Sequence, residues 1–176
     1  MIREYLNDVT DAIYKINTDE VESAINIIKQ TIEDDKQIFL IGNGGSAAIA
    51  SHICNDFQKG LECRTIALTD NIPLITAWAN DDSYVNIFSR QLEQLAQRGD
   101  LLIAVSGSGT SQNINEAMFC AFDLDLNSIK ITSAIYPRIR STINTSYPIV
   151  IPTEDMQVFE DCASIIGHAI YKELKK

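Results

Sequence analysis

The chain has 176 residues, of which 45% are hydrophobic and 22% are charged, and this composition is typical of one soluble globular domain. It contains 14 Lys and Arg against 24 Asp and Glu, so its formal net charge of −10 argues against a broad basic face for nucleic acid. The four cysteines form no C-x-x-C pair, no apolar run approaches the length of a membrane span, and the first residues lack the apolar core of a signal peptide. We therefore expect a cytoplasmic protein with reduced thiols and with no nucleic-acid or membrane partner.

Residues 1–35 have the periodicity of two amphipathic helices. The first helix carries an apolar stripe whose members recur at steps of three and four: Ile2, Leu6, Val9, Ile13 and Ile16. Thr18 or Asp19 is expected to cap the second helix. A stripe of this kind packs either on the core of its own chain or on another subunit, and we expect these helices to contribute to oligomerisation.

From residue 36 onward, short apolar runs alternate with helical stretches. The expected strands are Gln37–Ile41, Arg64–Leu68, Asp100–Val105, Ser128–Thr132 and Tyr147–Ile151. The expected helices are 45–58, 72–79, 83–96, 111–123 and 154–174. This alternation predicts an α/β fold, a doubly wound five-stranded parallel sheet flanked by helices. Residues 36–176 form this core, and the whole chain, 1–176, is expected to be one domain.

Two loops rich in glycine and serine follow the first and third expected strands. They are Gly42-Asn43-Gly44-Gly45-Ser46 and Ser106-Gly107-Ser108-Gly109-Thr110-Ser111. Glycines let the backbone N–H groups approach a ligand, hydroxyls add neutral donors, and the helix that follows contributes partial positive charge. The pair predicts a cradle for a phosphate monoester that needs no arginine, although each loop alone is also compatible with an ordinary tight turn.

The first loop also satisfies the dinucleotide-binding pattern G-x-G-x-x-A. That pattern requires an acidic residue about 20 positions further on, at the end of the second strand. Glu62 precedes the expected strand and Asp70 follows it late, so the sequence favours the phosphate monoester.

Both histidines of the chain lie on expected helices that also carry acidic residues. His52 and Asp56 are four residues apart and share a helix face, whereas Glu160 precedes His168 by eight residues, or about 12 Å of helix. The four side chains suit a site for zinc or a similar divalent ion, and they equally suit an acid–base pair.

Several stretches of the sequence resemble the sugar isomerase (SIS) domain family and, within it, the phosphoheptose isomerases. They are I-G-N-G-G-S-A-A (41–48), N-D (80–81), F-S-R-Q (88–91), G-D-L-L-I-A-V-S-G-S-G-T-S (99–111) and E-x7-H (160–168). The resemblance runs from about residue 5 to the end of the chain. It implies a homotetramer with active sites between subunits, and conversion of sedoheptulose 7-phosphate to a heptose 7-phosphate through an enediol.

The resemblance also implies roles for individual residues. The phosphosugar contacts match Asn43, Gly44, Gly45, Ser46, Asn80, Asp81, Ser106, Gly107, Ser108, Ser111 and Glu160. The metal ligands, expected to hold Zn²⁺, match His52, Asp56, Glu160 and His168. The catalytic acid–base residues match Asp56 and His168.

Several positions depart from the family pattern. Asp56 replaces a glutamate, Glu160 replaces a glutamine, Thr110 replaces an asparagine, and Ala134–Ser146 replaces a glycine-rich turn. These changes keep a second interpretation open. In it the chain is a non-catalytic SIS module that binds a phosphosugar or a protein partner and resembles the DnaA-initiator-associating protein.

Overall fold

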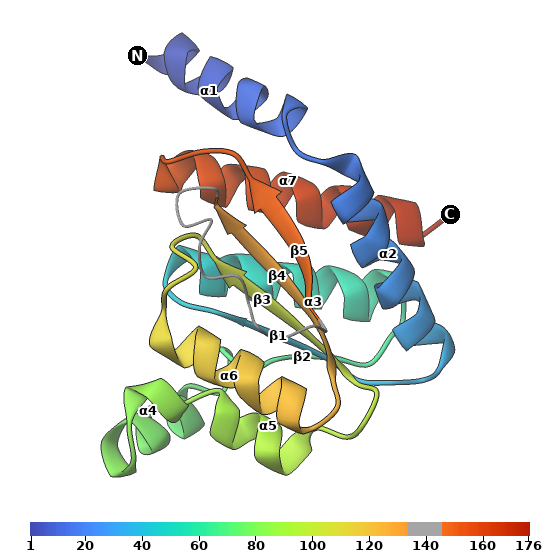
Figure 1. The fold of residues 1–176 in the computed structure, drawn as a ribbon, viewed down its shortest axis with the longest axis vertical. Helices are drawn as coiled ribbons and strands as arrows, with labels where there is room; N and C mark the ends of the chain where they lie inside the picture. The colour runs from blue at the N-terminus through green and yellow to red at the C-terminus, as the bar shows by residue number, and fades with distance from the viewer. Residues whose placement is uncertain (134–145) are drawn as a thin grey trace.

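The protein is described by a computed structural model that covers residues 1–133 and 146–176 (Figure 1). Except for Ser146, the segment predicted to replace the family's glycine-rich turn lies outside these residues. Five parallel strands form one sheet in the order β2-β1-β3-β4-β5, which confirms the expected fold class. The strands are β1 (Ile38–Gly42), β2 (Thr65–Ala67), β3 (Leu101–Ser106), β4 (Asn127–Ser133) and β5 (Ser146–Ile151).

Strand β1 lies between β2 and β3, and this position determines where a ligand can bind. Leu40 of β1 is in register with Ala67 of β2 on one side and with Ile103 of β3 on the other. The chain therefore leaves β1 toward one edge of the sheet and later returns to its opposite side. Ligands of doubly wound sheets bind at such a reversal, beyond the carboxyl ends of the strands. Both glycine- and serine-rich loops begin there.

Helices cover both faces of the sheet. They are α1 (Ile2–Tyr14), α2 (Thr18–Glu33), α3 (Gly45–Gly60), α4 (Ile72–Asp81), α5 (Ser89–Leu95), α6 (Gln112–Asp123) and α7 (Met156–Leu174), with a short 3₁₀ helix, η1 (Tyr84–Asn86). Alternate residues of β1 enter different cores: Leu40 packs with α2, α3 and α7, whereas Phe39 packs with α5 and α6. Figure 1 shows α4, α5 and α6 gathered on one side of the sheet.

Two details differ from the sequence-based prediction. The stretch 83–96 was expected to be one helix, but it divides into η1 and α5, and Ile87 and Phe88 between them are both buried in the core. The N-cap of α2 is Asn17, whose side chain accepts a hydrogen bond from the Asp19 N–H at 3.0 Å, so the prediction of Thr18 or Asp19 was wrong. A β-region backbone at Asn17 lets its side-chain oxygen, Oδ1, reach this otherwise unpaired N–H.

Helix α1 divides its apolar stripe between the core and the surface. Its C-terminal part and Ile16 pack on the chain's own core, and the Tyr5 hydroxyl donates to Asp161 of α7 at 2.6 Å. Ile2 and Leu6 remain exposed, with 81% and 56% of their surface accessible. None of the helices in the described ranges combines the length and apolar character needed to cross a bilayer.

Candidate active site

The loop between β1 and α3 presents the N-terminus of a sixteen-residue helix. Gly44, the N-cap, has φ of 55° and ψ of −124°, a backbone conformation that a side chain would strain. No side chain caps the first turn of α3, so the N–H groups of Gly45 and Ser46 at its start can meet an anion. Ser46, the second residue of this turn, is buried.

The second loop joins β3 to α6 and has a similar construction. Gly109, with φ of 66°, closes a turn in which its N–H donates to the Ser106 carbonyl at 3.1 Å. The Ser108 hydroxyl accepts from the Thr110 N–H at 3.3 Å and lies 3.5 Å from the hydroxyl of Ser111. Ser111 is the N-cap of α6 but makes no capping bond with its side chain. The Ser111 hydroxyl therefore stands at a helix N-terminus where it can serve a ligand.

Asn43 and Asn113 hold the two loops together. The Asn43 amide donates to Asn113 Oδ1 at 2.9 Å, and the Asn113 amide donates back to Asn43 Oδ1 at 2.8 Å. The hydroxyl of Tyr84 also donates to Asn43 Oδ1, at 3.1 Å. Sequence reasoning identified Asn43 but missed Asn113 and Tyr84. Asn113 is only 3% exposed, but the first turn of α6 also contains Gln112 and Asn115, so its sequence did not distinguish Asn113.

His52, Asp56 and His168 form a cluster on the adjoining faces of α3 and α7. The Nε2 atoms of the two histidines are 2.9 Å apart, and Asp56 Oδ2 lies 3.6 Å from each of them. Ligand atoms placed about 2.1 Å from a tetrahedral zinc ion lie roughly 3.4 Å from one another. The three ligand atoms are all within 4.8 Å of one another, so the donor set and its spacing fit a divalent metal.

Close packing of α3 on α7 brings these side chains together. Gly167 faces Ile53, and a Cβ atom added to Gly167 would lie 2.7 Å from Ile53 Cδ1. Ile53 directly follows His52 and Gly167 directly precedes His168, so the close contact of the helices lies next to both histidines.

Glu160 lies at the other end of this helix pair. Its carboxylate packs against Gly45, where a Cβ atom would overlap it, and the described residues place it outside the His52–Asp56–His168 cluster. Gly45 precedes His52 by seven residues and Glu160 precedes His168 by eight, so α3 and α7 run side by side in the same direction. Of the four expected metal ligands, the structure brings three together and places Glu160 beside the first loop.

Asn80 and Asp81 lie at the exposed end of α4. The Asn80 amide donates to Asp81 Oδ1 at 2.7 Å. Within residues 1–133 and 146–176, neither side chain forms a hydrogen bond to either glycine-rich loop.

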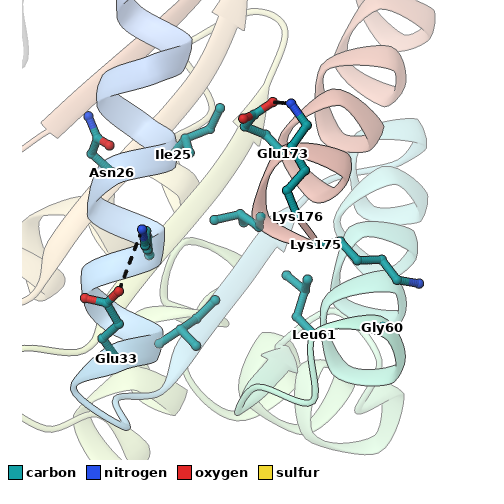
Figure 2. A pocket seen from close by; sticks show the side chains of 11 residues that line it. Ile25, Asn26, Glu33, Gly60, Leu61, Glu173, Lys175 and Lys176 are labelled. Carbon is teal, nitrogen blue, oxygen red and sulfur yellow. Dashed lines mark hydrogen bonds and ion pairs between the residues drawn. The ribbon is translucent and has the colours of Figure 1, made fainter.

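A cavity of about 650 Å³ lies elsewhere, between α2 and the C-terminal ends of α3 and α7 (Figure 2). Gly60, Leu61 and Glu173 line it, and Lys29 pairs with Glu33 on its α2 wall. Helix C-termini carry partial negative charge, which disfavours a phosphate. Lys29, Lys175 and Lys176 also line the cavity, but it lacks the free helix N-terminus that each of the two loops supplies.

The chain is similar in sequence and in structure to known proteins of one family. The sequence pattern of the SIS domain matches residues 3–133. The phosphoheptose isomerase of Clostridium acetobutylicum is 33% identical over 165 residues, which are 90% of this chain and 82% of that protein. The structure of a phosphoheptose isomerase from Neisseria gonorrhoeae superposes with a TM-score of 0.91 at 28% identity, covering 98% of this chain and 94% of the other. A second one, from Francisella tularensis, has a TM-score of 0.92 at 24% identity, covers 98% of this chain and 95% of the other, and supports the fold.

Proposed function

The chain belongs to the SIS domain family, and on this premise we propose that it is a phosphosugar ketose–aldose isomerase that converts sedoheptulose 7-phosphate to a heptose 7-phosphate. The relatives named phosphoheptose isomerase support this substrate class, because they align with nearly the whole chain. The proposal also has support from the site itself, which combines an anion cradle with an acid–base cluster.

The observation that carries the proposal is the spacing between these two features. The cradle is formed by the loops that the Asn43–Asn113 pair joins, and the His52–Asp56–His168 cluster lies further along α3. His52 follows Gly45 by seven residues, which is about 10 Å along a helix. This distance is comparable with the length of an extended seven-carbon sugar phosphate. A sugar held by its phosphate at the loops would therefore present C1 and C2 to the cluster.

Isomerisation of a ketose moves a proton from C1 to C2 through an enediol, and we assign the two proton transfers to Asp56 and His168. The Asp56 carboxylate takes the proton from C1 and later returns it to C2. The His168 imidazole donates a proton to the C2 carbonyl oxygen as the enediol forms and recovers a proton from the C1 hydroxyl as the aldehyde forms. Half of the His168 side chain is accessible, so a bound sugar can reach it.

A divalent ion, which we propose to be zinc, would polarise the carbonyl when bound. His52, Asp56 and His168 are its proposed ligands. With His168 Nε2 on the ion, its Nδ1 would carry the proton that is transferred, and Asp56 would use its second oxygen. Glu160 would join them as a fourth ligand only after its carboxylate leaves Gly45. In its present position Glu160 is better suited to contact the substrate near the phosphate loop.

We further propose that the enzyme is cytoplasmic and works as a homotetramer with its sites at subunit interfaces. The exposed Ile2 and Leu6 on α1 and the exposed Ile72 on α4 support an assembly that covers them. Asn80 and Asp81, which stand apart from the loops, would then contact the sugar within the assembled site.

The test is an isomerase assay with sedoheptulose 7-phosphate and a panel of five- and six-carbon ketose phosphates, each run with added zinc and with a chelator. We expect turnover of the seven-carbon substrate, lost with chelator and in His168→Ala. Absence of turnover with every metal and substrate would overturn the proposal. Binding of the phosphosugar without turnover would instead support the non-catalytic SIS module.

A further inference from the structure

Lys130 lies beneath the second phosphate loop. Along β4, Ile129 and Ile131 face the core that α3 and α7 cover, so Lys130 faces the opposite side of the sheet. Its ammonium donates to the Gly109 carbonyl of the loop and to Asn115 Oδ1 of α6, both at 3.0 Å. The side chain thus connects the middle of the sheet to the loop that begins α6.

The charge of Lys130 has no partner of opposite sign in the described part of the chain. Both acceptors are neutral oxygens, and no carboxylate of residues 1–133 or 146–176 lies within 4.0 Å of the ammonium. Burial lowers the pKa of Lys130, as expected for a cation that is removed from water without compensation. A charge in this position costs stability unless something else stabilises it.

A second polar group under the same loop also lacks a partner. The hydroxyl of Thr132, two residues further along β4, is buried with no hydrogen-bond partner among the described residues. It lies directly under Gly109, because a Cβ atom added to Gly109 would be 2.9 Å from Thr132 Oγ1. Two polar groups, the Lys130 ammonium and the Thr132 hydroxyl, therefore lie under this loop, and packing of the sheet alone does not account for them.

We propose that Lys130 is a positioning residue of the phosphate site, which fixes the Gly109 carbonyl and places a formal positive charge beneath the loop that a bound phosphate neutralises. This inference rests on the proposed function, because it requires the phosphate of the sugar to occupy the Ser106–Ser111 loop. It also explains how a chain with a net charge of −10 can hold a dianion: the loops supply N–H groups and hydroxyls, and Lys130 supplies local charge.

The test compares Lys130→Gln, Lys130→Met and Lys130→Arg with the wild type and with Lys29→Gln. Lys29→Gln removes the same formal charge from an exposed pair with Glu33, far from the loop, and is the matched control. The affinities for sedoheptulose 7-phosphate and for inorganic phosphate are measured by calorimetry at low and high salt, together with KM, kcat and the Tm of each free protein.

We expect the Gln and Met variants to bind phosphate and phosphosugar about tenfold more weakly, since a charge at this site acts at reduced dielectric. KM should rise with little change in kcat, and the salt dependence of binding should flatten. The Arg variant and Lys29→Gln should stay near the wild type. A purely structural role would lower the Tm instead and leave the salt dependence unchanged.

Retention of wild-type phosphate affinity and salt dependence by Lys130→Gln would overturn the inference and leave the proposed function standing. A wild type that binds inorganic phosphate but turns over no phosphosugar would overturn the proposed function alone, and the variants would still be compared with inorganic phosphate. A wild type that binds neither inorganic phosphate nor the phosphosugar, and turns over no phosphosugar, would overturn both.

Discussion

The side-chain amides of Asn43 and Asn113 are joined by two reciprocal hydrogen bonds, 2.9 and 2.8 Å long, which fasten the β1–α3 loop to the first turn of α6. Each loop could form alone, but a phosphate held by both requires them at a fixed separation. The separation of the two loops therefore depends on a contact between two residues that are 70 positions apart in sequence.

Replacing Asn113 with alanine should loosen the cradle. The change leaves the amide nitrogen of Asn43 without its partner, so we expect the affinity for the phosphosugar to fall about tenfold and the free energy of unfolding to fall by about 1–3 kcal/mol. Calorimetry and chemical denaturation measure both effects, with Asn55→Ala, an exposed residue of α3, as the control. Asn43→Ala and the double variant complete a thermodynamic cycle, and strictly additive effects would contradict the coupling.

The histidine cluster predicts one bound zinc ion per chain. His52→Ala and His168→Ala should each lower zinc affinity at least about tenfold, because each removes one of three converging ligand atoms. Glu160→Gln should change zinc affinity less, since its carboxylate lies against Gly45. Metal analysis and competition with a chelator measure these affinities. A larger loss in Glu160→Gln than in His52→Ala would contradict the ligand assignment.

Gly167 controls the distance between α3 and α7. In Gly167→Ala the added methyl group meets Ile53, so we expect the helices to separate, the free energy of unfolding to fall by about 1–3 kcal/mol and zinc affinity to drop. Ile53→Ala removes both atoms that the methyl group approaches, Cδ1 and Cγ1, and should restore part of the zinc affinity in the double variant. No recovery in the double variant would show that the contact is not the cause.

Asp100 stabilises the amino-terminal ends of the central strands β1 and β3. It is 3% exposed, and its two carboxylate oxygens accept from the backbone N–H groups of Gln37 at 2.9 Å and Gln97 at 2.8 Å. Asp100→Ala leaves two backbone donors unpaired, so we expect a loss of about 2–4 kcal/mol in the free energy of unfolding. Asp123→Asn, at an exposed position of α6, is the control, and an equal loss in both variants would contradict this role.

The features that could be predicted from the sequence are those that depend on local pattern. The alternation of strands and helices predicted the parallel sheet. Glycines at the strand ends predicted both loops, because a backbone that approaches a ligand closely needs glycine at those positions. The roles of Asn113 and Lys130 could not be predicted, since periodicity shows which face of an element a residue occupies but not what lies opposite. Whether Lys130 meets Gly109 depends on strand register and on the path of a loop 21 residues away.

The position of Glu160 illustrates the same limit. Its spacing of eight residues from His168 already implied that the two side chains were about 12 Å apart along α7. Which of the two would meet His52 depended on how α3 packs on α7, and the contact of Gly167 with Ile53 is part of that packing. The sequence pattern could not show which acidic residue lies beside the two histidines. Contacts between helices that are distant in sequence determine it.

The most direct test of the central claim is to incubate the zinc-loaded protein with sedoheptulose 7-phosphate in D₂O and to follow the sugar by NMR. An enediol route predicts an aldose phosphate, with deuterium at C2 of the product or at C1 of the recovered ketose. Asp56→Asn should lower the rate by about 10²–10⁴-fold, because a general base contributes on that scale. Folded, zinc-loaded wild type that yields neither an aldose phosphate nor exchange at C1 would contradict the account.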